Sequence, residues 1–253
     1  MIAAIGSHAL HQRSTERFCK TSLKFHATGL PINSKHVQIR AANSACKRQM
    51  NIDPEQIPVA VLYQHLIRII APRPIAWVST ISQSGITNLA PFSFFTGVGA
   101  KPPSVVFCPS NRRDGTPKDT LKNILDNGEF VINAVPFRLA QTMNLSSAEL
   151  PPEDSEFELT GIEKAMSSIV KPPRVLESPV SLECTLMHHL PLEPGAGGAN
   201  IVVGKIVQIH LDDSALDHEG WADPALLDLI GRLGGASYCR TTERFEIPRP
   251  SVP

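Results

Sequence analysis

Runs of apolar residues, separated by proline, glycine and polar turns, divide the chain after residue 50 into short elements. Residues 59–70 (VAVLYQHLIRII) predict a short helix or a helix–strand transition. Strands are predicted after this segment at 74–81, 86–99, 104–109 and 129–135. This half of the chain is therefore predicted to be mostly extended.

Helical patterns are few. Residues 117–127 carry apolar side chains at helical spacing, and Thr116 fits the N-cap position before them. Pro117 suits the first helical position, and Asp119 stands where it would complete a capping box with Thr116. Further helices are predicted at 137–147 and 223–231.

Two long β patterns dominate the second half of the chain. They cover residues 179–190 and 199–213, and the glycine-rich PGAGG between them predicts a hairpin loop. A glycine-rich tail follows at 231–241. Because the strands come in hairpins and the helices are short, we expect a mainly β fold, an antiparallel barrel with a few flanking helices.

Proline interrupts the strand predicted at 86–99. Pro91 cannot donate to a sheet ladder, so this strand is expected at an edge, at a bulge or facing a ligand. On a strand, Asn88, Ala90, Phe92 and Phe94 share one face. Such a face could form a wall for a planar heteroaromatic ligand, or part of an ordinary core. The same two readings apply to Trp77 on the preceding strand.

Basic residues gather just before the helix predicted at 117–127. Arg112, Arg113 and Lys118 lie next to its N-terminus, where unpaired N–H groups favour an anion. The alternative is a well-capped surface helix with a solvated basic turn. The local pattern does not decide between the two.

Charge is distributed unevenly along the 253 residues, although the formal net charge is zero. Residues 1–49 contain eight Lys and Arg and one acid, which leaves 16 basic and 23 acidic side chains in 50–253. An acidic body argues against nucleic acid as a partner. No apolar run reaches the roughly 18 residues of a transmembrane helix, so no membrane partner is expected.

The first 49 residues lack sustained periodicity and are poor in acidic residues. They have the composition of an organellar transit peptide (mitochondrial or plastid), or of a stretch translated from a wrongly chosen start, since Met50 opens an ordinary N-terminus. In either case we expect a disordered extension and a folded domain over 50–253. The five cysteines are odd in number and contain no CxxC, which favours free thiols in a reducing compartment such as the cytoplasm.

Common enzyme signatures are missing. The segment GAGGAN (195–200) is not GxGxxG and lies between two predicted strands, so a Rossmann site is unsupported. No P-loop, HExxH or GxSxG occurs. His188 and His189 are adjacent and would point to opposite faces of a strand, so they cannot share one metal. No metal site is predicted.

A series of motifs in fixed order is more specific. These are PRPIAWVST (72–80), NLAPFSFF (88–95), KPPSVVF (101–107), RDGTPKDTLKNI (113–124), EFVINAV (129–135), PPRVLESPVSLEC (172–184), IVVGKIVQIHLDD (201–213) and RLGGASY (232–238). Together they resemble the flavin reductase-like family of FMN-binding split barrels, over roughly residues 55–245.

The resemblance implies a six-stranded antiparallel split barrel, a homodimer and non-covalently bound flavin, FMN in preference to FAD. It assigns the flavin phosphate to Lys118, helped by Arg113, Asp119 and Thr120. The ring and ribityl chain would be contacted by a set of residues on the strands: Trp77, Ser79, Asn88, Ala90, Pro91, Ser93 and Phe94.

The activity implied is that of an NAD(P)H-dependent flavin oxidoreductase. Hydride passes from the nicotinamide to the flavin, so no catalytic side chain beyond the cofactor is expected. The final acceptor would be a small molecule or a protein. Two alternatives stay open: an FMN-carrying electron-transfer protein that a protein partner reduces, and a flavin-binding module without turnover.

Overall fold

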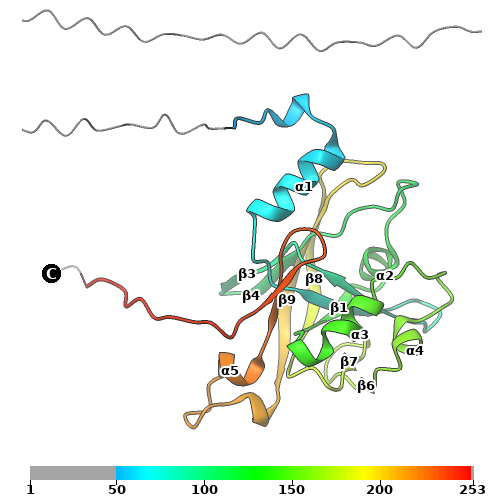
Figure 1. The fold of residues 1–253 in the computed structure, drawn as a ribbon. Coiled ribbons are helices and arrows are strands. Elements are labelled where there is room, and N and C mark those ends of the chain that lie inside the picture. The colour runs from blue at the N-terminus through cyan, green and yellow to red at the C-terminus, as the bar shows by residue number, and fades with distance from the viewer. Residues whose placement is uncertain (1–49, 252–253) are drawn as a thin grey trace, which may run out of the picture. The chain divides into compact units, whose positions relative to one another are not determined.

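Seven antiparallel strands form one sheet in the computed structural model, which describes residues 50–251 (Figure 1). The strand order is β2-β1-β5-β8-β9-β4-β3. The strands are β1 (Ala76–Ile81), β2 (Thr87–Phe92), β3 (Phe95–Ala100), β4 (Pro103–Phe107), β5 (Glu129–Asn133), β8 (Val180–Pro191) and β9 (Asn200–Leu211). This is the mainly β, antiparallel architecture that the hairpin pattern predicts.

The sheet has seven strands where six were expected, because the segment predicted as one strand over 86–99 is broken. β2 ends at Phe92 and β3 begins at Phe95, with a bend at Ser93 and Phe94 between them. β2 is an edge strand, and Pro91 lies opposite Trp77 of β1. The edge position predicted from the proline is confirmed, since an edge strand has no second neighbour to which that residue would donate.

Short helices flank the sheet. They are α1 (Val59–Ile69), α2 (Asp119–Asn127), α3 (Ala140–Leu145), α4 (Glu156–Thr160) and α5 (Pro224–Leu227), with 3-10 turns η1 (Pro54–Gln56), η2 (Phe137–Leu139) and η3 (Asp213–Ala215). Helix 59–70 and the helical segment 137–147 are confirmed. The pattern in the polar stretch near Pro151 and Pro152 did not predict α4.

Two small antiparallel ladders complete the fold, β6 (Lys164–Ala165) with β7 (Arg174–Val175), and β10 (Ile230–Arg232) with β11 (Tyr238–Arg240). The helix predicted at 223–231 is wrong beyond Leu227. Asp228 has φ 44°, a left-handed conformation that ends α5, and the chain then enters β10. The glycine-rich tail is thus part of a hairpin and packs against the body.

The sheet separates two apolar clusters. One contains Phe92, Phe107 and Phe130, whose rings pack in tilted pairs at centroid distances of 5.2 and 5.6 Å. The other contains Trp77 and packs beneath α3 and α4. Gly204 of β9 lets the first cluster close, because a Cβ there would lie 2.3 Å from the Phe130 ring.

A buried carboxylate fastens a loop to the sheet. Glu183 of β8 is fully buried and accepts hydrogen bonds from the backbone N–H groups of residues 168, 169 and 170, at 2.6, 2.6 and 2.9 Å. His210 of β9 lies 2.5 Å from the same carboxylate. Burial alone would raise the pKa of Glu183, but these hydrogen bonds outweigh it and lower the pKa to about 2.

Within residues 50–251, no helix is long and apolar enough to cross a membrane. The extension predicted over residues 1–49 lies outside the described residues, and the boundary at residue 50 stays a prediction. Cys108, Cys184 and Cys239 are free thiols in the described part of the chain.

Candidate functional site

The N-terminus of α2 differs from the predicted capping box. The helix begins at Asp119 with Lys118 at the N-cap, and no side chain caps it. The Thr116 hydroxyl donates at 2.6 Å to Asp114, which also accepts from the Thr116 N–H at 2.9 Å. Asp119 pairs with Arg112. Both side chains of the expected capping box are therefore engaged elsewhere, and the box is wrong.

The first residues of α2, whose N-terminus has no side-chain cap, line a small cavity of about 90 Å³. Its lining joins β2 to α2 and to the segment after α3, and consists of Asn88, Ala90, Pro91, Phe92, Arg112, Lys118, Asp119, Thr120, Ser146, Ser147, Ala148, Glu149, Leu150 and Glu156. Six of the residues predicted from the sequence as ligand contacts thus line one cavity.

Lys118 is the cation of this cavity that is not neutralised by a neighbour. Arg112 is paired with Asp119. Within residues 50–251, the Lys118 ammonium makes no hydrogen bond and no ion pair. An ammonium that is half-buried beside a helix N-terminus is suited to a bound anion. Arg113 is exposed and does not line the cavity, so the sequence pattern identified the basic turn but not which arginine faces inward.

A buried hydrogen-bond network holds the polar wall of the cavity. The Thr120 hydroxyl donates to the Asn88 side-chain oxygen at 2.7 Å, and the Thr80 hydroxyl donates to the same oxygen at 3.3 Å. The Asn88 amide group donates to both oxygens of Glu156 at 2.8 Å, and the Leu89 N–H donates to one of them at 2.8 Å. Asn88 and Thr120 are thereby fixed in orientation.

Glu156 is a cavity-lining residue that the sequence did not indicate. It lies at the start of α4 in a polar stretch without periodicity, and it reaches the cavity only because α4 packs on β2. Burial raises the pKa of the Glu156 carboxyl above its usual range, although the hydrogen bonds from Leu89 and Asn88 act in the opposite direction.

A second cavity, of about 200 Å³, adjoins the first and shares Pro91, Phe92 and Ser147 with it. Its lining is more aromatic and comprises Tyr63, Ile75, Pro91, Phe92, Ser93, Met143, Asn144, Ser147, Arg232 and Tyr238. The two cavities together run from the start of α2 to the bend after β2. A small cavity suited to an anion thus lies beside a larger one with aromatic walls.

Arg73 positions the bend that contributes Ser93. Its Nε donates to the Ser93 hydroxyl at 3.2 Å, and its guanidinium lies 5.5 Å from the centre of the Phe94 ring. The remaining guanidinium N–H groups donate to the carbonyls of Ile67, Ile70 and Leu233. Phe94 therefore packs on Arg73 and lines neither cavity, because the strand break turns it off the face shared by Asn88, Ala90 and Phe92.

Trp77 and Ser79 lie outside both cavities. Trp77 is fully buried in the second apolar cluster, and its indole N–H donates to the Ser146 hydroxyl at 2.8 Å. The Ser79 hydroxyl donates to the carbonyl of Pro173. Trp77 contacts the cavity lining through Ser146. Its surroundings are those of a core residue, which was one of the two alternatives for this tryptophan.

Comparison with known proteins agrees with this geometry. Residues 68–234 match the flavin reductase like domain. A protein of Aquifex aeolicus without an assigned function is 41% identical over 179 residues, which is 71% of this chain and 89% of the relative.

The chain belongs to the flavin reductase-like family.

Two solved members of similar sequence share the fold. Component B of nitrilotriacetate monooxygenase from Bacillus cereus has a TM-score of 0.75 and 30% identity, with 79% of this chain and 99% of that chain covered. The 2-nitrobenzoate 2-nitroreductase NbaA of Pseudomonas fluorescens has a TM-score of 0.72 and 31% identity, with coverages of 81% and 98%. The split-barrel fold of this flavin reductase-like chain is thus the expected one.

Proposed function

We propose that this protein is an NAD(P)H-dependent oxidoreductase that binds FMN in the two adjoining cavities. One observation carries the proposal: the unpaired Lys118 and the uncapped start of α2 line the same small cavity, and that cavity shares three lining residues with a neighbouring one that has aromatic walls. A phosphate attached by a flexible chain to a flat heteroaromatic ring matches this order of surfaces.

The small cavity beside Lys118 is suited to a single phosphate monoester. Lys118 and the backbone N–H groups at the start of α2, that of Thr120 included, would hold it, while Asp119 keeps Arg112 in place. The cavity measures only about 90 Å³, and Glu149 and Glu156 also line it. A cavity of this size holds one phosphate group, so its volume favours FMN over FAD.

The ring end would be defined by Pro91, Phe92 and Ser93 on one side and by Tyr63 of α1 on the other. Ala90 is small and half-buried, which allows a flat ring to approach the strand closely. Bound flavin supplies the redox chemistry, taking two electrons as hydride from the nicotinamide and passing them to an acceptor. The chain orients the ring, anchors the phosphate and excludes water from the buried face.

The names of the two solved relatives support a redox role, since one is a component of a monooxygenase and the other a nitroreductase. They differ in the final acceptor, so the proposal names none. A homodimer and a cytoplasmic location belong to the same proposal. The three free thiols of the described residues suit a reducing compartment.

Anaerobic stopped-flow spectroscopy tests the proposal. The FMN-loaded protein is mixed with NADH or NADPH, and the flavin absorbance is followed. Bleaching with at least one of them is expected. Bleaching with dithionite but with neither nucleotide would favour the electron-transfer alternative or a module without turnover. A protein that binds no FMN would overturn the proposal entirely.

A further inference from the structure

The C-terminal arm, residues 242–251, leaves the body of the protein after the β10–β11 hairpin and runs extended (Figure 1). Every residue of the arm is exposed. Phe245 is 84% exposed and Ile247 79% exposed. Single exposed apolar side chains are common on proteins, but two on one short segment indicate that the segment binds an apolar surface.

The arm has a two-residue apolar period. In an extended chain Phe245 and Ile247 point to one side, while Arg244 and Glu246 point to the other. Pro248 then restricts the backbone to extended conformations. The segment therefore presents one apolar edge, which is the pattern of a strand-like peptide that docks in a hydrophobic groove.

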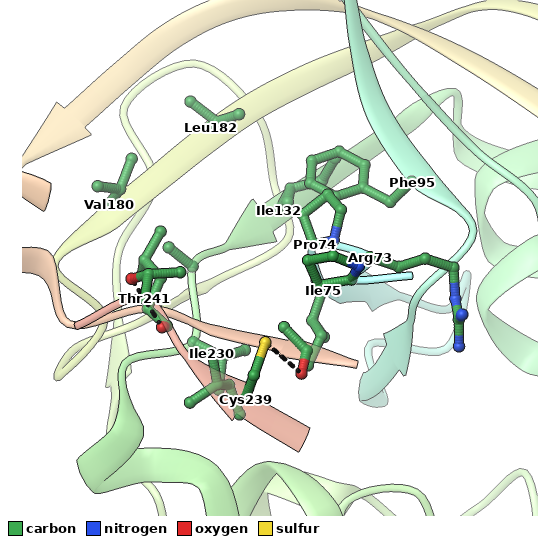
Figure 2. Close-up of a pocket in the computed structure, with 15 residues that line it drawn as sticks. Arg73, Pro74, Ile75, Phe95, Ile132, Val180, Leu182, Ile230, Cys239 and Thr241 are labelled. Carbon is green, nitrogen blue, oxygen red and sulfur yellow. Dashed lines mark hydrogen bonds between the residues drawn. The ribbon is translucent and has the colours of Figure 1, made fainter. Parts of the chain in front are cut away.

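The same chain offers a matching cavity of about 320 Å³, which we call the apolar basin. Its lining is drawn from β3, β5, β8 and the β10–β11 hairpin, and is apolar except for Arg73, Cys239 and Thr241. Figure 2 shows Phe95, Ile132, Val180, Leu182 and Ile230 gathered around it. The basin lies where the two apolar clusters of the fold meet, since Ile132 belongs to one and Ile230 to the other.

Size and chemistry agree between the arm and the basin. A dry cavity of roughly 150 Å³ is enough for benzene, so about twice that volume accommodates a phenyl ring and a branched aliphatic side chain. The basin contains no carboxylate and its one full charge, on Arg73, is directed toward Ser93. Neither Arg244 nor Glu246 would need to enter it.

The arm does not occupy the basin of its own chain, although it begins at the rim. Thr241 lines the basin, and its N–H donates to the carbonyl of Leu229 at 3.1 Å. A turn at 241–243 then directs the chain outward, with the Arg244 guanidinium donating to the Thr241 carbonyl at 3.0 Å. Phe245 and Ile247 follow Thr241 by four and six residues, so an extended chain carries them about 13 and 20 Å from the rim, enough to reach a second copy packed against it.

We propose that the arm of one copy inserts Phe245 and Ile247 into the apolar basin of a second copy. A two-fold axis makes the exchange reciprocal, so that each copy gives one arm and receives one. The inference concerns assembly and does not depend on flavin. It assigns an occupant to the apolar basin and a binding role to the exposed apolar edge of the arm.

Cross-linking in the full chain tests the contact directly. Ile247→Cys is made in a background with Cys19, Cys46 and Cys108 changed to Ser. The native Cys239 thiol lies in the basin, whereas burial raises the pKa of the Cys184 thiol to about 12 and keeps it unreactive. A short bis-maleimide is added to refolded mixtures of unlabelled and heavy-nitrogen-labelled protein, and linked peptides are identified by mass spectrometry.

We expect peptides in which position 247 of one copy is linked to Cys239 of another, one peptide labelled and the other unlabelled. The fraction of such mixed pairs should equal that expected from random pairing of the two protein pools. Pairs with only one label would mean that the arm folds back on its own chain, and absence of the 247–239 pair would mean that it docks elsewhere. Either result overturns the proposal. Glu246→Cys, on the opposite edge of the arm, is the matched control and should link far less.

Sedimentation provides a second readout. Phe245→Ser with Ile247→Ser removes the apolar edge from an exposed segment, so folding of each copy should be unchanged. The dimer dissociation constant is expected to rise roughly 100-fold or more, since four buried side chains are lost per dimer. Arg244→Ser with Glu246→Ser is the control. An unchanged dissociation constant, or a parent protein that is monomeric throughout, would overturn the exchange.

Discussion

The side-chain amide nitrogen of Asn88 lies 2.8 Å from each carboxylate oxygen of Glu156, a residue 68 positions further along the chain. The oxygen of the same amide accepts the Thr120 hydroxyl at 2.7 Å. Glu156 thus decides which way the amide faces, and through it where the Thr120 hydroxyl lies. Glu156 lines the small cavity and orients Asn88 and Thr120, so this buried acid is expected to affect FMN affinity.

Glu156→Gln should reduce both stability and FMN affinity. The glutamine NH₂ group would face the N–H donors of Asn88 and Leu89, leaving at least one buried donor unpaired, at about 1–3 kcal/mol of stability. The loss is measured by urea unfolding without flavin and by FMN titration. Arg113→Gln, at an exposed position outside the cavity, is the control, and a variant indistinguishable from it would contradict this role of Glu156.

The pH dependence of the Glu156 variant has a definite sign. Burial raises the pKa of Glu156 above its ordinary value of 4.5, so the folded state binds this proton more tightly than the unfolded chain. The stability that Glu156 contributes is full below the ordinary value and declines as pH rises through the raised one. The difference in unfolding free energy between parent and Glu156→Gln should therefore shrink as pH rises above the ordinary value of 4.5.

Glu183 should show the opposite dependence. Its pKa is lowered to about 2, so its contribution is complete above the ordinary value of 4.5 and is lost as pH falls toward 2. Glu183→Gln is expected to destabilise the protein by about 3–5 kcal/mol at neutral pH, because buried N–H groups lose their acceptor. Chemical unfolding at decreasing pH should show the gap to the parent closing, and a gap that widens in acid would refute the assignment.

Lys118→Ala separates the two ends of the proposed cofactor. A charge-assisted contact with a phosphate is worth about 1.5–3 kcal/mol, so FMN affinity should fall roughly 10- to 150-fold. Riboflavin, which has no phosphate, should bind almost as before. Arg113→Ala is the matched cationic control. Equal and small losses for both ligands in fluorescence titrations would mean that Lys118 is merely a solvated side chain.

Ala90→Leu should act on the ring end instead. The added volume enters a narrow space between β2 and the first apolar cluster, and overpacking there costs about 1–3 kcal/mol. FMN and riboflavin should both bind more weakly, the reverse of the Lys118 pattern. Thermal unfolding without flavin is measured in parallel. Early melting with normal FMN binding would assign Ala90 to the core alone.

Residues 50–253, expressed without the preceding segment, should fold, dimerise and retain FMN. All elements that form the sheet and both cavities lie within this range. The yellow colour of the purified protein and its sedimentation coefficient provide the measurements. If only the full chain folds, the boundary at residue 50 is incorrect.

The sheet was predictable because its strands alternate or run apolar over lengths that local sequence reveals. The break at Ser93 was not, since it depends on Arg73 reaching across from a neighbouring segment to hold the bend. The cap of α2 failed for a similar reason. Asp114 competes for the Thr116 hydroxyl, and a sequence pattern does not rank two partners that are both within reach.

The residues of the candidate site were also predicted only in part. Lys118, Thr120, Asn88 and Ala90 were predicted, and they line one cavity. Glu156 was missed, because its relation to Asn88 arises only when α4 packs on β2. Long-range contacts of this kind leave no local pattern in the sequence.

Arg73 links parts of the protein that are remote in sequence. Its guanidinium joins the end of α1, the Leu233 carbonyl 160 residues away and the Ser93 hydroxyl at the ring end of the site. Lysine, with a single ammonium group, cannot span these acceptors. Arg73 therefore links the C-terminal hairpin to the ring end of the proposed site, so substitutions in the hairpin are expected to change flavin affinity from positions that do not touch the cofactor.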